Sequence, residues 1–420
     1  MAAVPVQEFK LEPDNELRFE TELKGDSVRL ELRSGTAELF GCELVKGREY
    51  VFEKGAKAAV FTWDGATVEL KGKPEAAYIA KETPMVIYLN THAVLEQLRR
   101  KAEAEEGRGP IVMVVGPADV GKSTLCRMML NWGVRMGRKP LFVDLDVGQG
   151  NISIPGTIGA VMVERPAMPG DGYNLNAPLV YHYGHISPEK NLELLKIVTS
   201  KLASFVLQKF ETNKRVAHSG MIINTCGWVK GDGYKLLTHA ASAFEVDLIV
   251  VLDQERLYNE LIRDMPNFVK VVFQPKSGGA VERNRQFRIS TRESKVRQYF
   301  YGPKNTLFPQ NVQVNFDDIK VFKIGAPKVS AALLPEGMMP DENSMTRIVP
   351  VSPGPDLLHH IMAMSYAEST EEDLLTTNVL GFVCVLNVDT EKQKLTLLSP
   401  HPAPLPRNIF LISDVQYMEI

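Results

Sequence analysis

Apolar and polar residues alternate in short runs along the first part of the chain, from Glu8 to about Ile79. Segments such as SVRLELRSG and AAVFTWDGATVELKG alternate in this way, and Gly, Asp and Lys separate them. A period of two is typical of a β-strand with one buried and one solvated face. The pattern therefore predicts a small N-terminal domain made of β-strands.

The spacing of apolar residues becomes helical from Thr91 to Glu106 and changes again at Pro110. Five apolar runs without alternation follow: IVMVVG, PLFVDLDVG, GMIINTCGW, DLIVVLD and VKVVF. Unbroken apolar runs are typical of strands that are buried on both faces. Helical stretches between them are expected at 123–137, 187–210, 235–244 and 255–264. This repetition predicts a central α/β domain with a doubly wound, mostly parallel sheet.

The last part of the chain returns to strand-like patterns after about Gly302, in VQVNFDDIKVFKIG and VLGFVCVLNVDTEKQKLTLLSP. The segment 329–367 between them is rich in Pro, Met and Gly, and we expect it to form loops. A third, β-rich domain is therefore predicted. The predicted domain limits are 1–92 for the N-terminal β-domain, 93–305 for the central domain and 306–420 for the C-terminal domain.

Composition places the chain among intracellular globular proteins. Hydrophobic residues make up 44% and charged residues 24% of the 420 residues, which is close to the average. The net charge of −3 means that a nucleic-acid partner would need a local basic surface. No run approaches 18 apolar residues, so no membrane partner is expected. The four cysteines are too scattered for a disulfide framework or a zinc site and favour a reducing compartment.

The turn after the first apolar run of the central domain matches the phosphate-binding motif G-x-x-x-x-G-K-[ST]. Its residues are Gly116, Pro117, Ala118, Asp119, Val120, Gly121, Lys122 and Ser123, and Thr124 follows. A predicted strand precedes the turn and a predicted helix follows it, so the free N–H groups of the helix would face a phosphate. We expect Lys122 to bind the β- and γ-phosphates of ATP and Ser123 to bind Mg²⁺. The alternative is a glycine-rich turn that binds nothing.

Two aspartates in the next run, PLFVDLDVGQG, are candidate acid–base and metal groups. Asp144 and Asp146 are two residues apart and would point to one face of a strand. Asp146 is nearer to the carboxyl end, where ligands bind in doubly wound sheets. We expect Asp146 to accept a proton from an attacking hydroxyl, Asp144 to hold the metal or its water, and Gln149 to orient a γ-phosphate or water. Either aspartate could instead cap the following turn.

A basic segment at 274–297 carries several arginines after a Gly-Gly pair. Arg288 and Arg292 are four residues apart and would share one face of a helix. Such a helix could close over a nucleotide and direct guanidinium groups at the transferred phosphoryl group. The alternative is a solvated basic face.

The run NTCGWVKGDGY places candidate substrate-binding residues after another buried strand. The indole of Trp228 could stack on a nucleobase while Lys230 contacts a backbone phosphate, and Thr225 lies in the same run. Trp228 could instead be a core or interface aromatic residue. Thr225, Trp228, Lys230 and Gln149 are therefore candidates for contact with the substrate.

Several blocks together resemble the eukaryotic RNA 5′-hydroxyl kinases that are subunits of the pre-mRNA 3′-end cleavage factor and associate with the tRNA-splicing endonuclease. These blocks are GPADVGKST, VDLDVGQG with SIPGT, INTCGWVKG, VLDQERLYNEL and PKSGGAVER. The resemblance covers essentially the whole chain. It implies a small N-terminal β-domain, a central P-loop kinase domain, a small C-terminal domain and a nuclear protein.

The resemblance also implies roles for individual residues. It implies an enzyme that uses ATP and Mg²⁺ to phosphorylate the 5′-hydroxyl end of RNA, with Lys122 and Ser123 serving ATP and Mg²⁺. It further implies that Asp146 activates the hydroxyl and that Trp228 stacks on the terminal nucleotide. The arginines of the lid helix are then Arg288 and Arg292, with Arg283 just before them.

Two other functions remain open from the sequence. An ATP-binding scaffold subunit of an RNA-processing complex would use the same P-loop and would need no base. A GTPase-like switch would require an N-K-x-D motif at a strand end, where this chain has VLDQERL. Transfer of labelled phosphate to RNA, with competing nucleotides, distinguishes the three.

Overall fold

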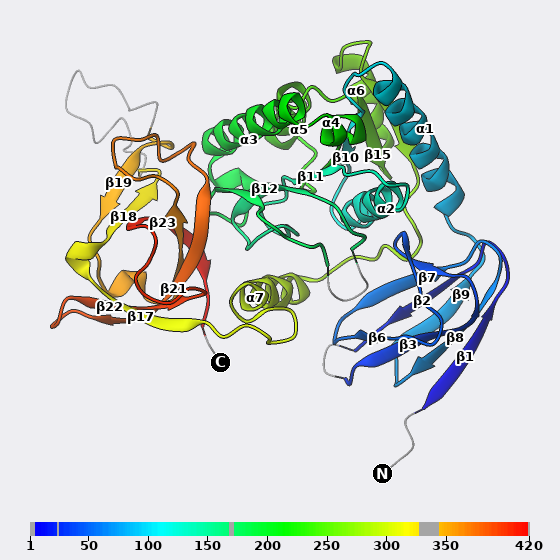
Figure 1. Cartoon of the computed structure of the whole chain (residues 1–420), viewed down its shortest axis with the longest axis horizontal. Helices are drawn as coiled ribbons and strands as arrows, with labels where there is room; N and C mark the ends of the chain where they lie inside the picture. Colours follow the sequence, from blue (N-terminus) through cyan, green and yellow to red (C-terminus); the bar gives the residue numbers. More distant parts are fainter. Residues whose placement is uncertain (1–4, 23–24, 168–171, 327–343, 419–420) are drawn as a thin grey trace.

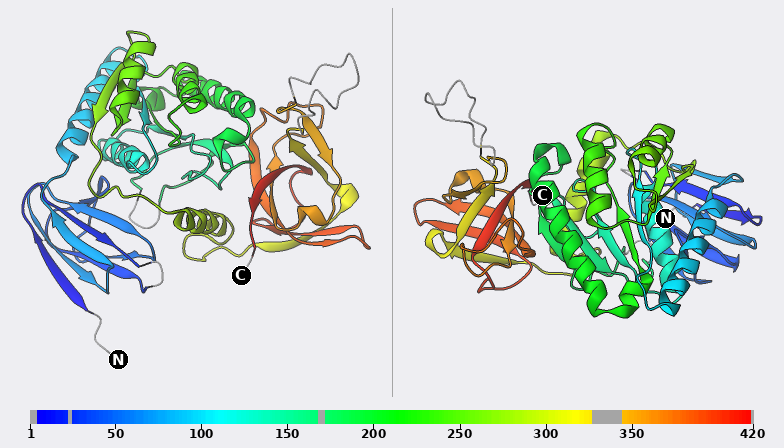
Figure 2. Two further views of the ribbon diagram at one scale, coloured as in Figure 1. Left: turned by 180° about the vertical axis from the view of Figure 1, so that it is seen from behind. Right: turned by 90° about the horizontal axis from the view of Figure 1, so that it is seen from above.

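The computed structural model describes residues 5–22, 25–167, 172–326 and 344–418 and shows three parts in a row (Figure 1). A β-sandwich lies at one end, a β-rich part at the other, and an α/β part between them; Figure 2 shows the same order from two other directions. The predicted fold class is confirmed. None of the described helices is long and apolar enough to cross a membrane.

The N-terminal sandwich consists of two antiparallel sheets. Its strands are β1 (Val6–Leu11), β2 (Glu16–Glu20), β3 (Val28–Gly35), β4 (Glu38–Leu39), β5 (Cys42–Glu43), β6 (Glu49–Phe52), β7 (Lys57–Phe61), β8 (Ala66–Lys71) and β9 (Ala76–Ala80). The strand orders are β1-β8-β3-β6 and β5-β4-β7-β2-β9. The predicted alternation puts Leu17, Leu30, Val60 and Val68 in the core, where none has exposed surface. Each such side chain contributes about 1.5–3 kcal/mol on burial.

Helix α1 (Met85–Ala104) connects the sandwich to the central part. It begins earlier than the pattern predicts, because Met85 and Tyr88 are buried and extend its apolar face. A division of the chain at residue 92 falls inside this helix, and the domain limits stay predictions.

The central part is built on a seven-stranded sheet. Its strands are β10 (Ile111–Val115), β11 (Leu141–Asp144), β12 (Thr157–Met162), β13 (Leu179–His182), β14 (Met221–Asn224), β15 (Leu248–Leu252) and β16 (Lys270–Gln274). In the order β13-β12-β11-β14-β10-β15-β16, the five strands from β11 to β16 are parallel. These five are the predicted apolar runs. Strands β12 and β13 are antiparallel additions that the runs do not predict.

Helices flank this sheet in two groups. They are α2 (Lys122–Arg135), α3 (Leu192–Thr212), α4 (Lys214–Ser219), α5 (Asp232–Ala243), α6 (Glu255–Asp264) and α7 (Arg285–Tyr301). Helix α3 packs on α5, and α1 packs on α2. Helix α7 lies apart from both pairs and runs from the central part toward the C-terminal sheet (Figure 1). The four predicted helices are present, and α4 is an additional short one.

The C-terminal part contains a second seven-stranded sheet in the order β17-β22-β21-β20-β23-β18-β19. Its strands are β17 (Gln310–Asn315), β18 (Lys320–Ile324), β19 (Ile348–Val351), β20 (His360–Ser365), β21 (Val379–Asp389), β22 (Lys394–Ser399) and β23 (Ile409–Gln416). The prediction that 329–367 forms loops is wrong for β19 and β20, and residues 329–343 lie outside the described ranges. Strand β20 is buried, so packing outweighs the low strand propensity of its sequence HIMAMS.

Candidate active site

The predicted phosphate-binding turn connects β10 to α2. Its curl depends on two residues in the left-handed region, Asp119 with φ +62° and Gly121 with φ +93°. A Cβ atom at Gly116 would lie 2.6 Å from the carbonyl oxygen of Leu252, so glycine is required there as well. Helix α2 begins at Lys122, and its unpaired N–H groups therefore face the turn. Around this curl, Ala118 and Ser123 are exposed, Thr124 is half-buried and Val120 is buried.

Lys122 is the buried cation of the turn, with 7% of its surface exposed. Its Nζ donates to the carbonyl oxygen of Pro117 at 2.6 Å. Burial lowers the pKa of Lys122, and the charge of nearby Asp146 opposes this shift. An ammonium group has three donors, so two remain for a phosphate.

Asp144 ends β11 and is held by hydrogen bonds at both oxygens. Oδ1 accepts from Asn224 Nδ2 at 2.9 Å and from the backbone N–H of Asp146 at 3.1 Å. Oδ2 accepts from the backbone and side-chain nitrogens of Asn151 at 2.8 and 3.1 Å. Burial, with the charge of Asp146 added, raises the pKa of Asp144 to about 6. The strand ends at Asp144, so Asp146 lies just beyond it and not within the strand as predicted.

Asp146 presents its two carboxylate oxygens differently. Oδ1 accepts from the backbone N–H groups of Gly148 and Gln149, each at 3.0 Å, and caps the turn. Oδ2 has no hydrogen-bond partner within the part of the chain that the structure describes. Burial raises the pKa of Asp146, and the charge of Lys122 opposes the rise. The capping role and the role of a base therefore use different oxygens and are compatible.

The basic segment that is predicted to form a lid contacts the phosphate-binding turn through Asp119. Asp119 Oδ2 accepts from the backbone N–H of Arg283 at 3.0 Å and pairs with Arg288 Nη2 at 2.6 Å. Gln149 Nε2 lies 3.5 Å from the carbonyl oxygen of Arg288. Arg292 lies one turn further along α7, and burial lowers its pKa. The structure thus brings Arg283, Arg288 and Gln149 to the turn.

The loop after β14 approaches the same turn. Thr225 is buried, and its hydroxyl donates to the carbonyl oxygen of Val114 at 2.8 Å, so Thr225 holds the loop against β10. A Cβ atom at Gly227 would lie only 2.6 Å from the backbone nitrogen of Ala118. Trp228 is half-buried and packs over the start of α5, and Lys230 is exposed.

Three residues near the site are missed by the sequence patterns. Asn151 and Asn224 hold Asp144, and only the position of Asn224 at a strand end could have indicated this. Arg18 of β2 donates to the carbonyl oxygen of Glu82 at 3.2 Å and lies 3.4 Å from Ser277 Oγ, beside the Gly-Gly pair that precedes the lid helix. Nothing in the local sequence of Arg18 indicates this long-range contact.

The residues expected to hold Mg²⁺ lie close together. Ser123 Oγ is 3.5 Å from Asn224 Oδ1, and the same asparagine donates to Asp144. Within the described ranges, no group of three His, Cys, Asp or Glu residues could hold a metal by itself. A hydroxyl and one carboxylate fit Mg²⁺, which in such sites takes its other ligands from phosphates and water.

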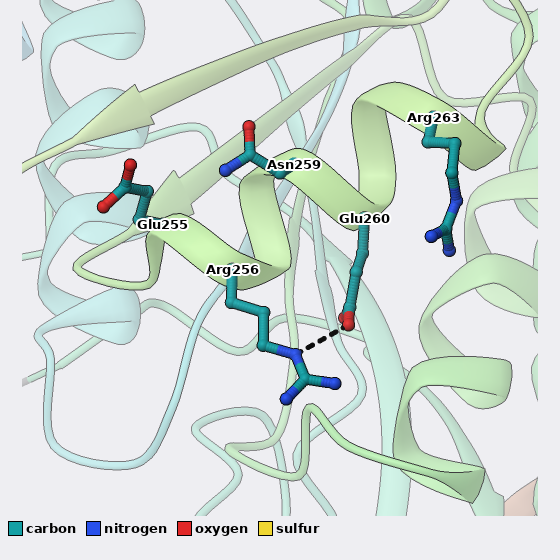
Figure 3. Close-up of a pocket in the computed structure, with 5 residues that line it drawn as sticks. All are labelled: Glu255, Arg256, Asn259, Glu260 and Arg263. Atoms are coloured by element: carbon teal, nitrogen blue, oxygen red, sulfur yellow. Dashed lines mark hydrogen bonds and ion pairs between the residues drawn. The ribbon is translucent and has the colours of Figure 1, made fainter.

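Two surface hollows lie away from the phosphate-binding turn. One, of about 550 Å³, runs along α6 and is lined by Glu255, Arg256, Asn259, Glu260 and Arg263. Figure 3 shows that Arg256 pairs with Glu260, at 2.8 Å, so charge in this hollow is largely neutralised. The other, of about 270 Å³, lies between α5 and α6 beside Lys230. The residues expected to bind and transfer phosphate therefore lie at the turn and not in either hollow.

Comparison with known proteins assigns all three parts of the chain. Residues 10–102 match the family described as "N-terminal beta-sandwich domain of polyadenylation factor". Residues 116–302 match "mRNA cleavage and polyadenylation factor CLP1 P-loop", and residues 307–419 match "Pre-mRNA cleavage complex II protein Clp1". These ranges leave only short connecting segments between them.

Similar proteins and structures extend over the full length. The chain is 58% identical to "Protein CLP1 homolog" of Anopheles gambiae, covering 99% of this chain and 98% of that protein. It is 54% identical to "Polyribonucleotide 5'-hydroxyl-kinase Clp1" of Homo sapiens, covering 99% and 97%. A solved Clp1p–Pcf11p complex has the same fold, with a TM-score of 0.85, 23% identity and 99% coverage of both chains. The chain belongs to the Clp1 family of polyribonucleotide 5′-hydroxyl-kinases.

Proposed function

We propose that this chain transfers the γ-phosphoryl group of ATP to the 5′-hydroxyl end of RNA in the presence of Mg²⁺. The observation that carries this proposal is the uncommitted Oδ2 of Asp146 near the buried ammonium of Lys122. One group can receive a proton and the other can neutralise phosphate charge, as phosphoryl transfer requires.

The P-loop side binds the donor. Lys122 supplies positive charge to the β- and γ-phosphates, and the N–H groups at the start of α2 bind phosphate oxygens. Ser123 and Asp144 would hold Mg²⁺, which supplies further neutralisation of the triphosphate when bound. Arg283, Arg288 and Arg292 add positive charge from the lid, where negative charge develops during transfer.

Asp146 acts on the acceptor. Its Oδ2 takes the proton of the 5′-hydroxyl as that oxygen forms a bond to the γ-phosphorus, while the bond from phosphorus to the β–γ bridging oxygen breaks and ADP leaves. Trp228 stacks on the terminal nucleotide, and Lys230 and Gln149 contact the substrate. Thr225 contributes by fixing the loop that carries Trp228, because its own hydroxyl is bonded to β10.

The matched families and structures also support a proposal about the protein assemblies that this chain joins. A relative has been solved in complex with Pcf11p, and the C-terminal match names pre-mRNA cleavage complex II. We infer that this chain is a nuclear subunit of the pre-mRNA cleavage complex and that it also associates with the tRNA-splicing endonuclease. Co-purification of both assemblies from nuclear extract tests this inference.

The experiment for the kinase function is transfer of label from γ-labelled ATP to an oligoribonucleotide with a 5′-hydroxyl. We expect the wild type to transfer label and Asp146→Asn to lose about 10²–10⁴-fold in kcat while still binding ATP. Asp389→Asn, at the end of β21 where Asp389 pairs with Lys392, is the matched control and should behave as wild type. If the asparagine variant at 146 kept full activity, the assignment of the base would be wrong. A wild type that bound ATP and transferred nothing would favour the scaffold function.

A further inference from the structure

The C-terminal sheet and the central sheet share one apolar core. Strand β13 packs beside β21, and buried residues such as Ile361, Phe382 and Leu411 belong to the same cluster as those of the central sheet. Closely packed protein interiors have low compressibility and transmit strain. The C-terminal sheet can therefore act as a rigid support for the parts of the central domain that it touches.

Polar contacts fasten the loop after β13 to this support. The carbonyl oxygen of Gly184 accepts from the backbone N–H of Asp414 at 2.8 Å and from Ser413 Oγ at 3.1 Å. Next to it, His185 Nδ1 lies 2.5 Å from Asp414 Oδ2. The loop is thus bonded to β23 through its main chain and through one side-chain pair.

The same loop contacts the turn that carries Asp146. The carbonyl oxygen of Ile186, the residue after His185, lies against Gly148, where an added Cβ atom would be only 2.8 Å from it. The backbone N–H of Gly148 in turn donates to Asp146 Oδ1 at 3.0 Å. A displacement of Ile186 would therefore move one of the donors that orient the Asp146 carboxylate.

The SIPGT block of the sequence makes a second connection between this loop and the turn. The backbone N–H of its Gly156 donates to the carbonyl oxygen of Val147 at 2.8 Å, and Val147 directly follows Asp146. The carbonyl oxygen of Gly156 accepts from the backbone N–H groups of Tyr183 and Gly184, at 3.0 and 2.9 Å. The loop after β13 therefore holds the turn at two neighbouring positions.

We propose that His185 and Asp414 are positioning residues of the kinase, which act through the loop after β13 to fix the direction of the Asp146 carboxylate. The proposal rests on the kinase function inferred above. Asp146 Oδ1 is held by the turn and Oδ2 is left for the proton, so the angle of the carboxylate depends on where the turn lies. A misplacement of about 1 Å at a reacting group can cost about 10²-fold in rate. The pair therefore acts on the rate of transfer and not on the binding of ATP or RNA.

The test measures kcat and the KM for both substrates in the transfer assay with the full-length protein. Asp414→Ala should lower kcat about tenfold and leave both KM values within about twofold of the wild type. Asp414→Asn keeps an oxygen that can accept a hydrogen bond from His185, and it should retain most of the activity. The matched control is Glu368→Ala, which removes a pair with Arg407, at 2.8 Å, elsewhere in the C-terminal part and should behave as wild type.

The same substitution in a protein without the base separates positioning from a general effect on the fold. In an Asp146→Asn background, Asp414→Ala should not reduce the residual transfer further, because the group that it positions is gone. A general loosening of the fold would lower transfer in both backgrounds, and that result would overturn the proposal. If Asp414→Ala does not fold, His185→Phe answers the same question, because it keeps the ring contact with Tyr183 and removes only the pair.

Other outcomes separate this inference from the kinase function itself. A wild-type kcat in both Asp414→Ala and His185→Phe overturns the positioning role and leaves the kinase function intact. A rise in the KM for ATP or RNA at an unchanged kcat would assign the pair to substrate binding and would also overturn the proposal. A wild type that transfers nothing contradicts the kinase function, and the positioning role is then excluded with it.

Discussion

Charged side chains have very different surroundings at the two sides of the central domain. At the junction with the sandwich and α1, Arg135 pairs with Glu38 of the sandwich at 2.7 Å, and Arg138 pairs with Glu96 and Glu103 of α1 at 2.5 and 2.8 Å. At the phosphate-binding end, Arg288 pairs with Asp119 at 2.6 Å, but Lys122 makes no ion pair with any described residue and donates to the carbonyl oxygen of Pro117. The junction neutralises its charges within the protein, whereas the phosphate-binding end leaves the charge of Lys122 for a ligand. Substitutions should therefore separate stability from activity.

The largest effect is expected at the phosphate-binding end. Lys122→Met should reduce transfer by at least about 10²-fold, because one preorganised electrostatic contact to the transferred group is lost. Thermal stability should not fall, since the substitution removes a buried charge whose pKa is already lowered by burial. Label transfer and the melting temperature without nucleotide measure the two quantities. Lys139→Met, which removes a surface pair with Glu164, is the control, and an equal loss of activity there would break the contrast.

The opposite behaviour is expected at the junction. Arg99 is completely buried, and its Nε donates to the carbonyl oxygen of Ser219 at 2.9 Å. Arg99→Met removes this bond and one of the cations beside Glu96, and it should destabilise the protein by about 2–3 kcal/mol. A lower midpoint of urea unfolding is the readout. Transfer activity at a temperature where both proteins are folded should be unchanged, and a large loss of kcat would show that the two regions are coupled.

The pH dependence probes the carboxylates that face the site. Burial raises the pKa of Asp144 to about 6 and also raises that of Asp146. Both must be ionised to bind metal or accept a proton, so activity is present above these pKa values and is lost as the pH falls through them. We expect kcat/KM to decrease about tenfold between pH 7 and pH 5. A flat profile down to pH 5, with ATP binding intact, would contradict the role given to these groups.

The smallest effect is expected where the lid meets the turn. Asp119→Asn keeps a residue type that tolerates the left-handed conformation but weakens the ion pair with Arg288. A partly exposed pair contributes about 1 kcal/mol or less, so kcat/KM should fall only a fewfold. The difference in kcat/KM between the variant and the wild type should become smaller at high salt, because salt screens the ion pair. If this difference in kcat/KM did not depend on salt, contacts other than the ion pair would hold the lid.

Much of the central domain is predictable from sequence because its strands and its phosphate-binding turn depend on short stretches of neighbouring residues. The five parallel strands are apolar runs, and the phosphate-binding turn needs a fixed spacing of Gly116, Gly121 and Lys122. Strand β12 is not predicted because Gly159 interrupts its pattern. That glycine is explained only by a neighbour far along the chain, since a Cβ atom there would lie 2.7 Å from the carbonyl oxygen of Leu179.

The site is predictable as a set of residues but not as a set of contacts. The motif indicates Lys122, Asp144 and Asp146 as a group. It does not indicate that Asn151 and Asn224 immobilise Asp144, because those bonds depend on where the loop and the adjacent strand are placed by the fold. The lid arginines are recognisable from their spacing, while their attachment to Asp119 requires a contact across more than 160 positions.

The close approach of Gly227 to Ala118 has a consequence for how this enzyme can change over evolution. The loop after β14, which carries Trp228, lies in close main-chain contact with the phosphate-binding turn at Gly227 and Ala118. Any residue larger than glycine at 227 would push this loop and the phosphate-binding turn apart, so a change at this position would act on the roles proposed for Trp228 and Lys122 at once.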